Sequence, residues 1–163
     1  MKILVTGGAG YIGSHTVVEL IQKGYEITIY DNLSNSSIKV LNKIYKITNT
    51  NVDFIEGNVC DDVKLNEIFS KIKFDGVLHF AGLKAIAESE ANPDIYYENN
   101  VIGTIQLLKA MKNHNIKMLV FSSSAAVYRN PINLPVKEEM NFDFPKNPYA
   151  KTKFIIENIL SDL

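Results

Sequence analysis

The sequence predicts an α/β protein built around a parallel β-sheet. Short apolar segments of strand length alternate with longer segments of helical periodicity along the 163 residues, a pattern typical of right-handed βαβ units. Residues 77–80 and 118–121 are apolar except for His79, as expected for strands that are buried on both faces. A single domain over residues 1–163 is predicted, because a chain of this length has room for one core.

The alternation can be divided into strands and helices by length and spacing. Strands are predicted near residues 2–6, 26–30, 52–56, 75–80 and 117–122, and helices near 11–23, 37–48, 61–72, 94–113 and 147–162. Apolar residues three and four apart predict one buried stripe on the helix at 94–113, formed by Val101, Ile105, Leu108 and Met111. Asp61 and Asp62 are typical of a helix start, since carboxylates favour the positive end of a helix.

A glycine-rich loop joins the first strand to the first helix. Residues 6–13 read Thr-Gly-Gly-Ala-Gly-Tyr-Ile-Gly. Glycines there allow a tight turn and let a diphosphate approach bare N–H groups, and the last glycine allows close packing of helix on strand. The loop therefore indicates a phosphate-binding site, with its candidates at Gly7, Gly10, Tyr11, Ile12 and Gly13.

The second strand ends in Asp31, about 20 residues beyond the glycines, which is the spacing of a dinucleotide-binding βαβ unit. A carboxylate at this position can accept both hydroxyls of an adenosine ribose and would repel a 2′-phosphate. The loop and the acid together predict a Rossmann-type, doubly wound parallel sheet of about five strands with helices on both faces. They also predict NAD as the cofactor in preference to NADP.

Tyr149 and Lys153 are four residues apart on the last predicted helix, so their side chains share one face. A tyrosine next to an ammonium group can act as a base, because the positive charge stabilises the phenolate. The same spacing can arise by chance in a chain with eight tyrosines. Ser122, Ser123 and Ser124 follow the fifth strand, where a hydroxyl could relay a proton or could be an ordinary strand-to-loop serine.

The fourth strand ends in Phe80, Ala81 and Gly82, whose small residues would let the backbone approach the cofactor. Lys84 could reach a phosphate or ribose, although a lone lysine is more often solvated. His79 is interpreted as a packed core residue, and no metal site is expected, because the three histidines and one cysteine lack ligand spacing.

Composition excludes several classes of protein. The formal net charge of −1 and the lack of a basic run argue against nucleic-acid binding. No apolar stretch is long enough to cross a membrane, and the first strand begins too early to leave room for a signal peptide. The lone Cys60 cannot form an internal disulfide, which favours a reducing cytoplasm.

These motifs together resemble the extended short-chain dehydrogenase/reductase family and, within it, the UDP-hexose 4-epimerases. The matching segments are residues 6–15, 31–33, 80–85, 96–100 and 122–124, with Tyr149 and Lys153. The resemblance implies tightly held NAD, a UDP-sugar substrate and a possible homodimer. It implies that the hydride of sugar C4 passes to NAD and returns to the other face of a 4-keto sugar.

The resemblance also implies roles for individual residues. On the adenosine and phosphate side it implies Asp31, Asn32, Asn35, Ser36 and Asn58. On the nicotinamide side it implies Lys84, Asn99 and Lys153. The further cofactor-binding candidates, not assigned to either side, are Val59, Phe80, Ala81, Gly82, Ser122 and Tyr149. The implied catalytic residues are Ser124, Tyr149 and Lys153.

The chain departs from the family pattern in three ways. Asn58 stands where the family usually has an aspartate at the adenine, and Arg129 where it usually has glycine. Family members are also substantially longer, so the C-terminal substrate domain is expected to be absent. Two alternatives stay open: a non-catalytic NAD-binding module and another nucleotide-sugar-modifying enzyme of the extended family, such as a 4,6-dehydratase. Ala125 and Ala126 argue against the dehydratase, which usually has an Asp-Glu pair there.

Overall fold

The structure, a computed structural model, describes residues 1–128, 135–138 and 145–163, so Arg129 lies outside the described residues. Its strands are β1 (Lys2–Thr6), β2 (Glu26–Asp31), β3 (Asp53–Glu56), β4 (Gly76–His79) and β5 (Leu119–Phe121). Its α-helices are α1 (Tyr11–Gln22), α2 (Lys39–Thr48), α3 (Asp62–Lys71), α4 (Ile86–Ala91), α5 (Pro93–Tyr96), α6 (Gly103–Asn113) and α7 (Pro148–Ser161). A π-helical segment, η1, spans Tyr97–Ile102, and a 3₁₀ turn, η2, spans Ala125–Tyr128.

The chain divides into two compact units. Unit 1 comprises Met1–Ala81 and Ile105–Ser122, and unit 2 comprises Gly82–Thr104 and Ser123–Leu163. All five strands lie in unit 1, and unit 2 is helical. The single NAD-binding domain over residues 1–163 stays a prediction.

The sheet of unit 1 is entirely parallel and has the strand order β3-β2-β1-β4-β5. This is the order of the first five strands of a doubly wound sheet and confirms the predicted fold class. The last residue of β1, Thr6, pairs with Tyr30 on one side and with His79 on the other. The carboxyl ends of the three central strands therefore lie together at one edge of the sheet.

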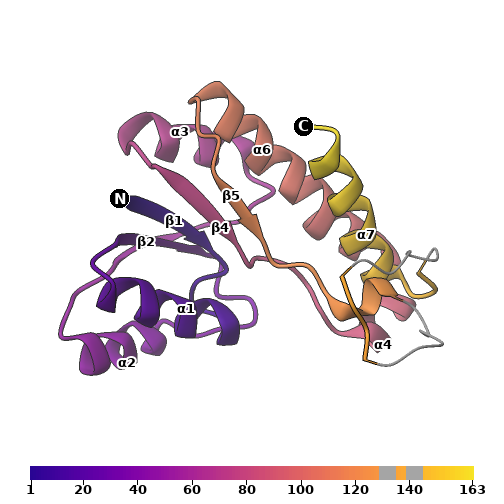
Figure 1. The fold of residues 1–163 in the computed structure, drawn as a ribbon, viewed down its shortest axis with the longest axis horizontal. Coiled ribbons are helices and arrows are strands. Elements are labelled where there is room, and N and C mark those ends of the chain that lie inside the picture. Colours follow the sequence, from indigo (N-terminus) through magenta and orange to yellow (C-terminus); the bar gives the residue numbers. More distant parts are fainter. Residues whose placement is uncertain (129–134, 139–144) are drawn as a thin grey trace. The chain divides into compact units, whose positions relative to one another are not determined.

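Helices cover both faces of this sheet (Figure 1). On one face, strand residues such as Val5 and Ile29 pack with Val17 of α1 and Ile44 of α2. On the other face, the cluster is formed by strand residues with side chains of α3 and α6, including Leu4, Tyr30, Val77, Leu65, Phe69, Leu107 and Met111. Because both faces are covered, the central strands β1 and β2 are buried along most of their length and β4 is buried at Gly76, Val77 and His79, which agrees with their apolar sequences. The expectation of burial on both faces is wrong for residues 118–121: Met118 and Val120 are exposed, because β5 is the last strand in the sheet order and only one of its faces is packed in the described residues.

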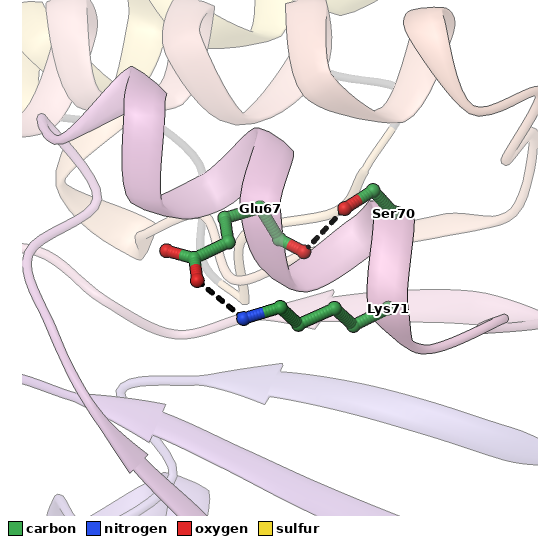
Figure 2. Close-up of polar contacts among 3 residues, drawn as sticks. All are labelled: Glu67, Ser70 and Lys71. Atoms are coloured by element: carbon green, nitrogen blue, oxygen red, sulfur yellow. Dashed lines mark hydrogen bonds and ion pairs between the residues drawn. The ribbon is translucent and has the colours of Figure 1, made fainter.

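Helix α3 begins where the sequence predicts. The Asp61 carboxylate accepts a hydrogen bond from the Lys64 N–H at 2.9 Å. Figure 2 shows the other end of this helix, where Lys71 pairs with Glu67 one turn earlier and the Ser70 hydroxyl donates to the Glu67 carbonyl at 2.7 Å. The Lys71–Glu67 pair is exposed on both sides, so its contribution to stability is small.

The predicted helix at 94–113 is not one regular helix. It is divided into α5, the π-helical η1 and α6, and α4 and η2 were not predicted. Within η1, the Asn100 carbonyl accepts a hydrogen bond from the Thr104 hydroxyl at 2.6 Å. A π-helical turn inside a helix is rare, and apolar periodicity does not distinguish it from α-helix.

Two other expectations can be compared with the structure. His79 is 1% exposed and its Nδ1 lies 2.6 Å from the Thr6 hydroxyl oxygen, which confirms it as a core residue. Among the described residues, no helix is long and apolar enough to cross a membrane, and no group of three metal-ligating side chains occurs.

Candidate functional site

Two glycines of the loop after β1 lie in close contact with backbone atoms, Gly7 with those of the 80–81 segment and Gly13 with those of the loop itself. Gly7 has a φ of +68°, and its N–H donates to the Tyr30 carbonyl at 2.9 Å. A Cβ on Gly7 would lie 2.5 Å from the Ala81 nitrogen, and a Cβ on Gly13 would lie 2.3 Å from the Gly7 carbonyl oxygen. Both positions therefore require glycine, and the close packing predicted for Gly13 is confirmed.

The start of α1 carries no side-chain cap. Gly10 occupies the N-cap position, no acidic residue lies in the first turn, and Tyr11 and Ile12 are exposed. The first N–H groups of a helix lack partners within the helix and carry a partial positive charge. The loop and helix start can therefore bind an anion such as a diphosphate.

Asp31 lies at the carboxyl end of β2 and is 8% exposed. Its Oδ2 accepts from the Ala9 N–H of the glycine loop at 3.0 Å. Its Oδ1 accepts from the Leu33 N–H and from the Ser36 hydroxyl, each at 2.9 Å. These bonds fix the carboxylate beside the loop, and its remaining lone pairs can accept the hydroxyls of a ribose.

Four further candidates lie near the ends of β2 and β3. Asn32 and Asn35 are exposed, and the Asn32 side chain accepts from the Ser34 N–H at 3.1 Å. Asn58 is also exposed, and its side-chain oxygen accepts from the Cys60 N–H at 2.9 Å, while Val59 is buried in the apolar cluster. The Asn58 side chain therefore holds a turn, but its amide N–H groups can still reach a base.

The end of β4 completes the edge of the sheet. The Phe80 N–H donates to the Thr6 carbonyl at 2.9 Å, and the Ser122 N–H donates to the His79 carbonyl at 3.1 Å. Unit 1 thus brings together the glycine loop, Asp31, the 80–81 segment and Ser122 at the carboxyl ends of its strands.

Unit 2 contains the predicted catalytic pair. Helix α7 begins at Pro148, and the Asn147 side chain accepts from the Ala150 N–H at 2.8 Å. Tyr149 is half-buried and lies one turn before Lys153, which is 6% exposed. Burial lowers the pKa of Lys153 from its ordinary value of 10.5 to about 8. At neutral pH this ammonium is available to stabilise a neighbouring phenolate.

The residue that sequence reasoning missed is Asn100 of η1, which is 2% exposed. Its side chain bonds both backbone groups of Leu83, accepting from the N–H at 2.8 Å and donating to the carbonyl at 3.0 Å. It also donates to the Thr152 hydroxyl of α7 at 3.1 Å and accepts from the Asn99 amide at 2.9 Å. Asn100 therefore ties the 82–84 segment to α7.

A helical repeat of buried residues could have revealed Asn100. Tyr96, Asn100 and Thr104 are four residues apart and all are buried, in line with Leu107 further along. In the predicted stripe, Val101 and Met111 are buried while Ile105 and Leu108 are only half-buried. The buried face of this helix is therefore partly polar. A search for apolar residues alone predicted a buried face that is offset from the one observed.

The remaining candidates in unit 2 differ in exposure. Lys84 is exposed, and Asn99 is half-buried. A Cβ on Gly82 would lie 3.6 Å from the Lys153 nitrogen and 3.3 Å from the Asn100 side-chain oxygen. Gly82, Asn99 and Lys153 therefore lie close together around Asn100. The Ser124 hydroxyl accepts from the Ala126 N–H at 3.2 Å.

Comparisons with known proteins agree with this arrangement. The chain is 50% identical over 166 residues to the UDP-glucose 4-epimerase of Bacillus subtilis (strain 168), covering 100% of this chain and 48% of that protein. It is 48% identical over 168 residues to the UDP-glucose 4-epimerase of Mus musculus, covering 99% and 48%. The chain thus spans about half the length of the curated relatives it matches.

Solved structures give the same result. The UDP-glucose 4-epimerase of Bifidobacterium longum in complex with NAD⁺ and UDP superimposes with a TM-score of 0.97 at 46% identity, over 99% of this chain and 48% of that one. Residues 4–163 match the sequence model of the family described as GDP-mannose 4,6 dehydratase. These matches confirm the resemblance seen in the sequence motifs. The chain belongs to the family that the GDP-mannose 4,6 dehydratase model describes.

Proposed function

We propose that this chain supplies the NAD-binding and catalytic half of an enzyme that epimerises a UDP-hexose at C4, interconverting UDP-glucose and UDP-galactose. The observation that carries the proposal is the pair on α7, where Tyr149 lies one turn before a buried Lys153 with a pKa of about 8. The identity to curated UDP-glucose 4-epimerases supports it. Because the chain spans about half of those relatives, the activity is proposed for a protein of the relatives' length that contains these residues, called the full-length product below.

The residues of unit 1 fit a dinucleotide without a 2′-phosphate. The uncapped start of α1 suits the diphosphate, and the fixed Asp31 carboxylate suits the ribose hydroxyls. We propose NAD, held on its adenosine side by Asp31, Asn32, Asn35, Ser36, Asn58 and Val59. On its nicotinamide side the proposed residues are Lys84, Asn99, Tyr149 and Lys153. Structures of two relatives are described with NAD and with UDP or a UDP-sugar.

In the proposed reaction, Tyr149 removes the proton of the sugar 4-hydroxyl and later returns it. The Lys153 ammonium stabilises the phenolate that this requires. The Ser124 hydroxyl donates a hydrogen bond to the sugar 4-oxygen. NAD, when bound beside these residues, would supply a reversible acceptor for the C4 hydride.

Two competing functions predict different results. A 4,6-dehydratase needs an acid and a base after Ser124, where the methyl groups of Ala125 and Ala126 cannot exchange protons. A non-catalytic module would bind NAD without needing Tyr149. A homodimer and a cytoplasmic location stay predictions.

The tests measure NAD binding and the epimerisation of UDP-galactose separately. Calorimetry on residues 1–163 should show NAD binding tighter than NADP, and these residues alone should not epimerise UDP-galactose. In the full-length product, Tyr149→Phe should lower the rate at least ~100-fold while NAD content is unchanged. Tyr45→Phe on the exposed side of α2 is the matched control and should retain full activity. In the full-length product, a Tyr149→Phe variant with undiminished turnover would place the base elsewhere, and an unaltered protein that binds NAD but shows no turnover would favour the module.

A further inference from the structure

Two of the three consecutive serines after β5, Ser123 and Ser124, make different hydrogen bonds. The Ser123 hydroxyl donates to the Glu157 carboxylate, 34 residues away along the chain. The Ser124 hydroxyl accepts from the Ala126 N–H at 3.2 Å, and the Ser124 carbonyl accepts from the Val127 N–H at 3.2 Å. Ser123 is thus linked directly to a side chain of α7.

Glu157 continues the row of proposed catalytic residues on α7. Tyr149, Lys153 and Glu157 are spaced four residues apart, so they share one face of the helix. The bond between Ser123 and Glu157 is partly buried. A hydrogen bond to a carboxylate is about twice as strong as one between neutral groups, and partial burial limits competition from water.

We propose that Glu157 is a positioning residue, whose carboxylate holds Ser123 and thereby keeps Ser124 at a fixed place relative to Tyr149 and Lys153. The proposal rests on the proposed function, in which Ser124 and Tyr149 act on the same sugar oxygen. Ser123 and Ser124 share a peptide bond, so fixing one restrains the other. A displacement of about 1 Å in such a group can cost ~100-fold in rate.

The first test uses residues 1–163 and does not depend on activity. Glu157→Ala should accelerate hydrogen exchange at the Ala126 and Val127 amides by about tenfold or more, because both bond to Ser124. Glu157→Gln keeps an acceptor oxygen and should change these rates less than about threefold. The Leu83 amide, which bonds Asn100 in the same unit, is the internal control. Unchanged rates at the two amides, or equal acceleration at Leu83, would overturn the proposal.

The second test uses the full-length product and UDP-galactose. Ser123→Ala and Glu157→Ala should each lower kcat about tenfold, with KM and NAD content unchanged, and the double variant should lose no more than the worse single variant. Glu157→Gln should restore most of kcat. Asn158→Ala, which removes only an exposed bond to the Phe154 carbonyl, is the matched control.

The outcomes separate this proposal from the proposed function. A normal kcat in Glu157→Ala, or additive losses in the double variant, would overturn the positioning role. If the unaltered protein shows no epimerisation, the proposed function fails, and the exchange rates still decide whether Glu157 holds Ser124.

Discussion

The two compact units of the chain bury polar side chains in different proportions. The core of unit 1 is formed mainly by apolar strands between two layers of helices, with residues such as Leu4, Ile29 and Leu65 fully buried. Unit 1 also buries Thr6, Thr28, Asp31 and His79, but polar residues make up a larger share of the buried side chains of unit 2, namely Ser89, Asn100, Thr104, Thr152 and Lys153. Apolar packing tolerates exchange between side chains of similar volume, whereas a buried hydrogen-bond network depends on each partner. Unit 1 should therefore accept conservative changes that unit 2 does not.

The largest loss of stability is expected at a position in unit 1 where even a small side chain cannot be accommodated. Gly13→Ala should lower the free energy of unfolding by more than about 3 kcal/mol, because the new Cβ meets backbone atoms that cannot move aside. Urea unfolding would measure it. Gly24→Ala is the control: its φ is +82° but no atom lies within 4 Å of the new Cβ, so the loss should be about 1 kcal/mol. Equal losses at both sites would show that backbone conformation, and not close packing, sets the requirement.

A direct comparison replaces one buried residue in each unit by another with the same number of side-chain heavy atoms. Asn100→Leu should cost about 3 kcal/mol, since it removes the side-chain partner of both Leu83 backbone groups and one of the two hydrogen bonds of the Thr152 hydroxyl, which keeps its bond to the Tyr149 carbonyl. Leu65→Met in unit 1 should cost less than about 1.5 kcal/mol. Urea unfolding of both variants under one condition tests the comparison. Similar losses would mean that the polar network is no more demanding than the apolar core.

Lys153 should make the stability of the chain depend on pH. Its folded-state pKa of about 8 lies below the ordinary 10.5. Between these values the unfolded state binds more protons, so the free energy of unfolding rises with pH, and below pH 8 the full cost of burying the charge is present.

Lys153→Met should therefore be more stable than the unaltered chain by about 2 kcal/mol at pH 7. The substitution also removes the contacts of the ammonium, which makes the gain smaller than the full shift in pKa would give. The gain should shrink as the pH rises toward 10.5. Urea unfolding of both proteins across this range is the measurement, and a difference that stays constant with pH would contradict the prediction.

The smallest expected change in stability comes from a substitution in β2 of unit 1. The Thr28 hydroxyl in β2 is buried and has no hydrogen-bond partner among the described residues. Thr28→Val removes this unpaired group at nearly constant shape and should stabilise the chain by about 1 kcal/mol. Thermal unfolding would detect it. A loss of stability would mean that the hydroxyl is satisfied in solution and that unit 1 relies on a further polar contact besides those of His79 and Asp31.

Local rules were enough for much of the molecule. The five strands, the glycine loop, Asp31 and the spacing of Tyr149 and Lys153 were predictable, because strand alternation, helical periodicity and the sterics of glycine act over a few residues. These features decide the fold of unit 1 and name the candidates for a cofactor and a base. The assigned roles of the individual site residues stay predictions.

Tertiary structure decided the rest. The bond of Asn100 to Thr152 joins residues 52 apart, and the bond of Ser123 to Glu157 joins residues 34 apart. The burial that lowers the pKa of Lys153 and the different hydrogen bonds of Ser123 and Ser124 also depend on tertiary packing. Local spacing carries no record of them, since desolvation and hydrogen-bond partners are set by residues that folding brings together.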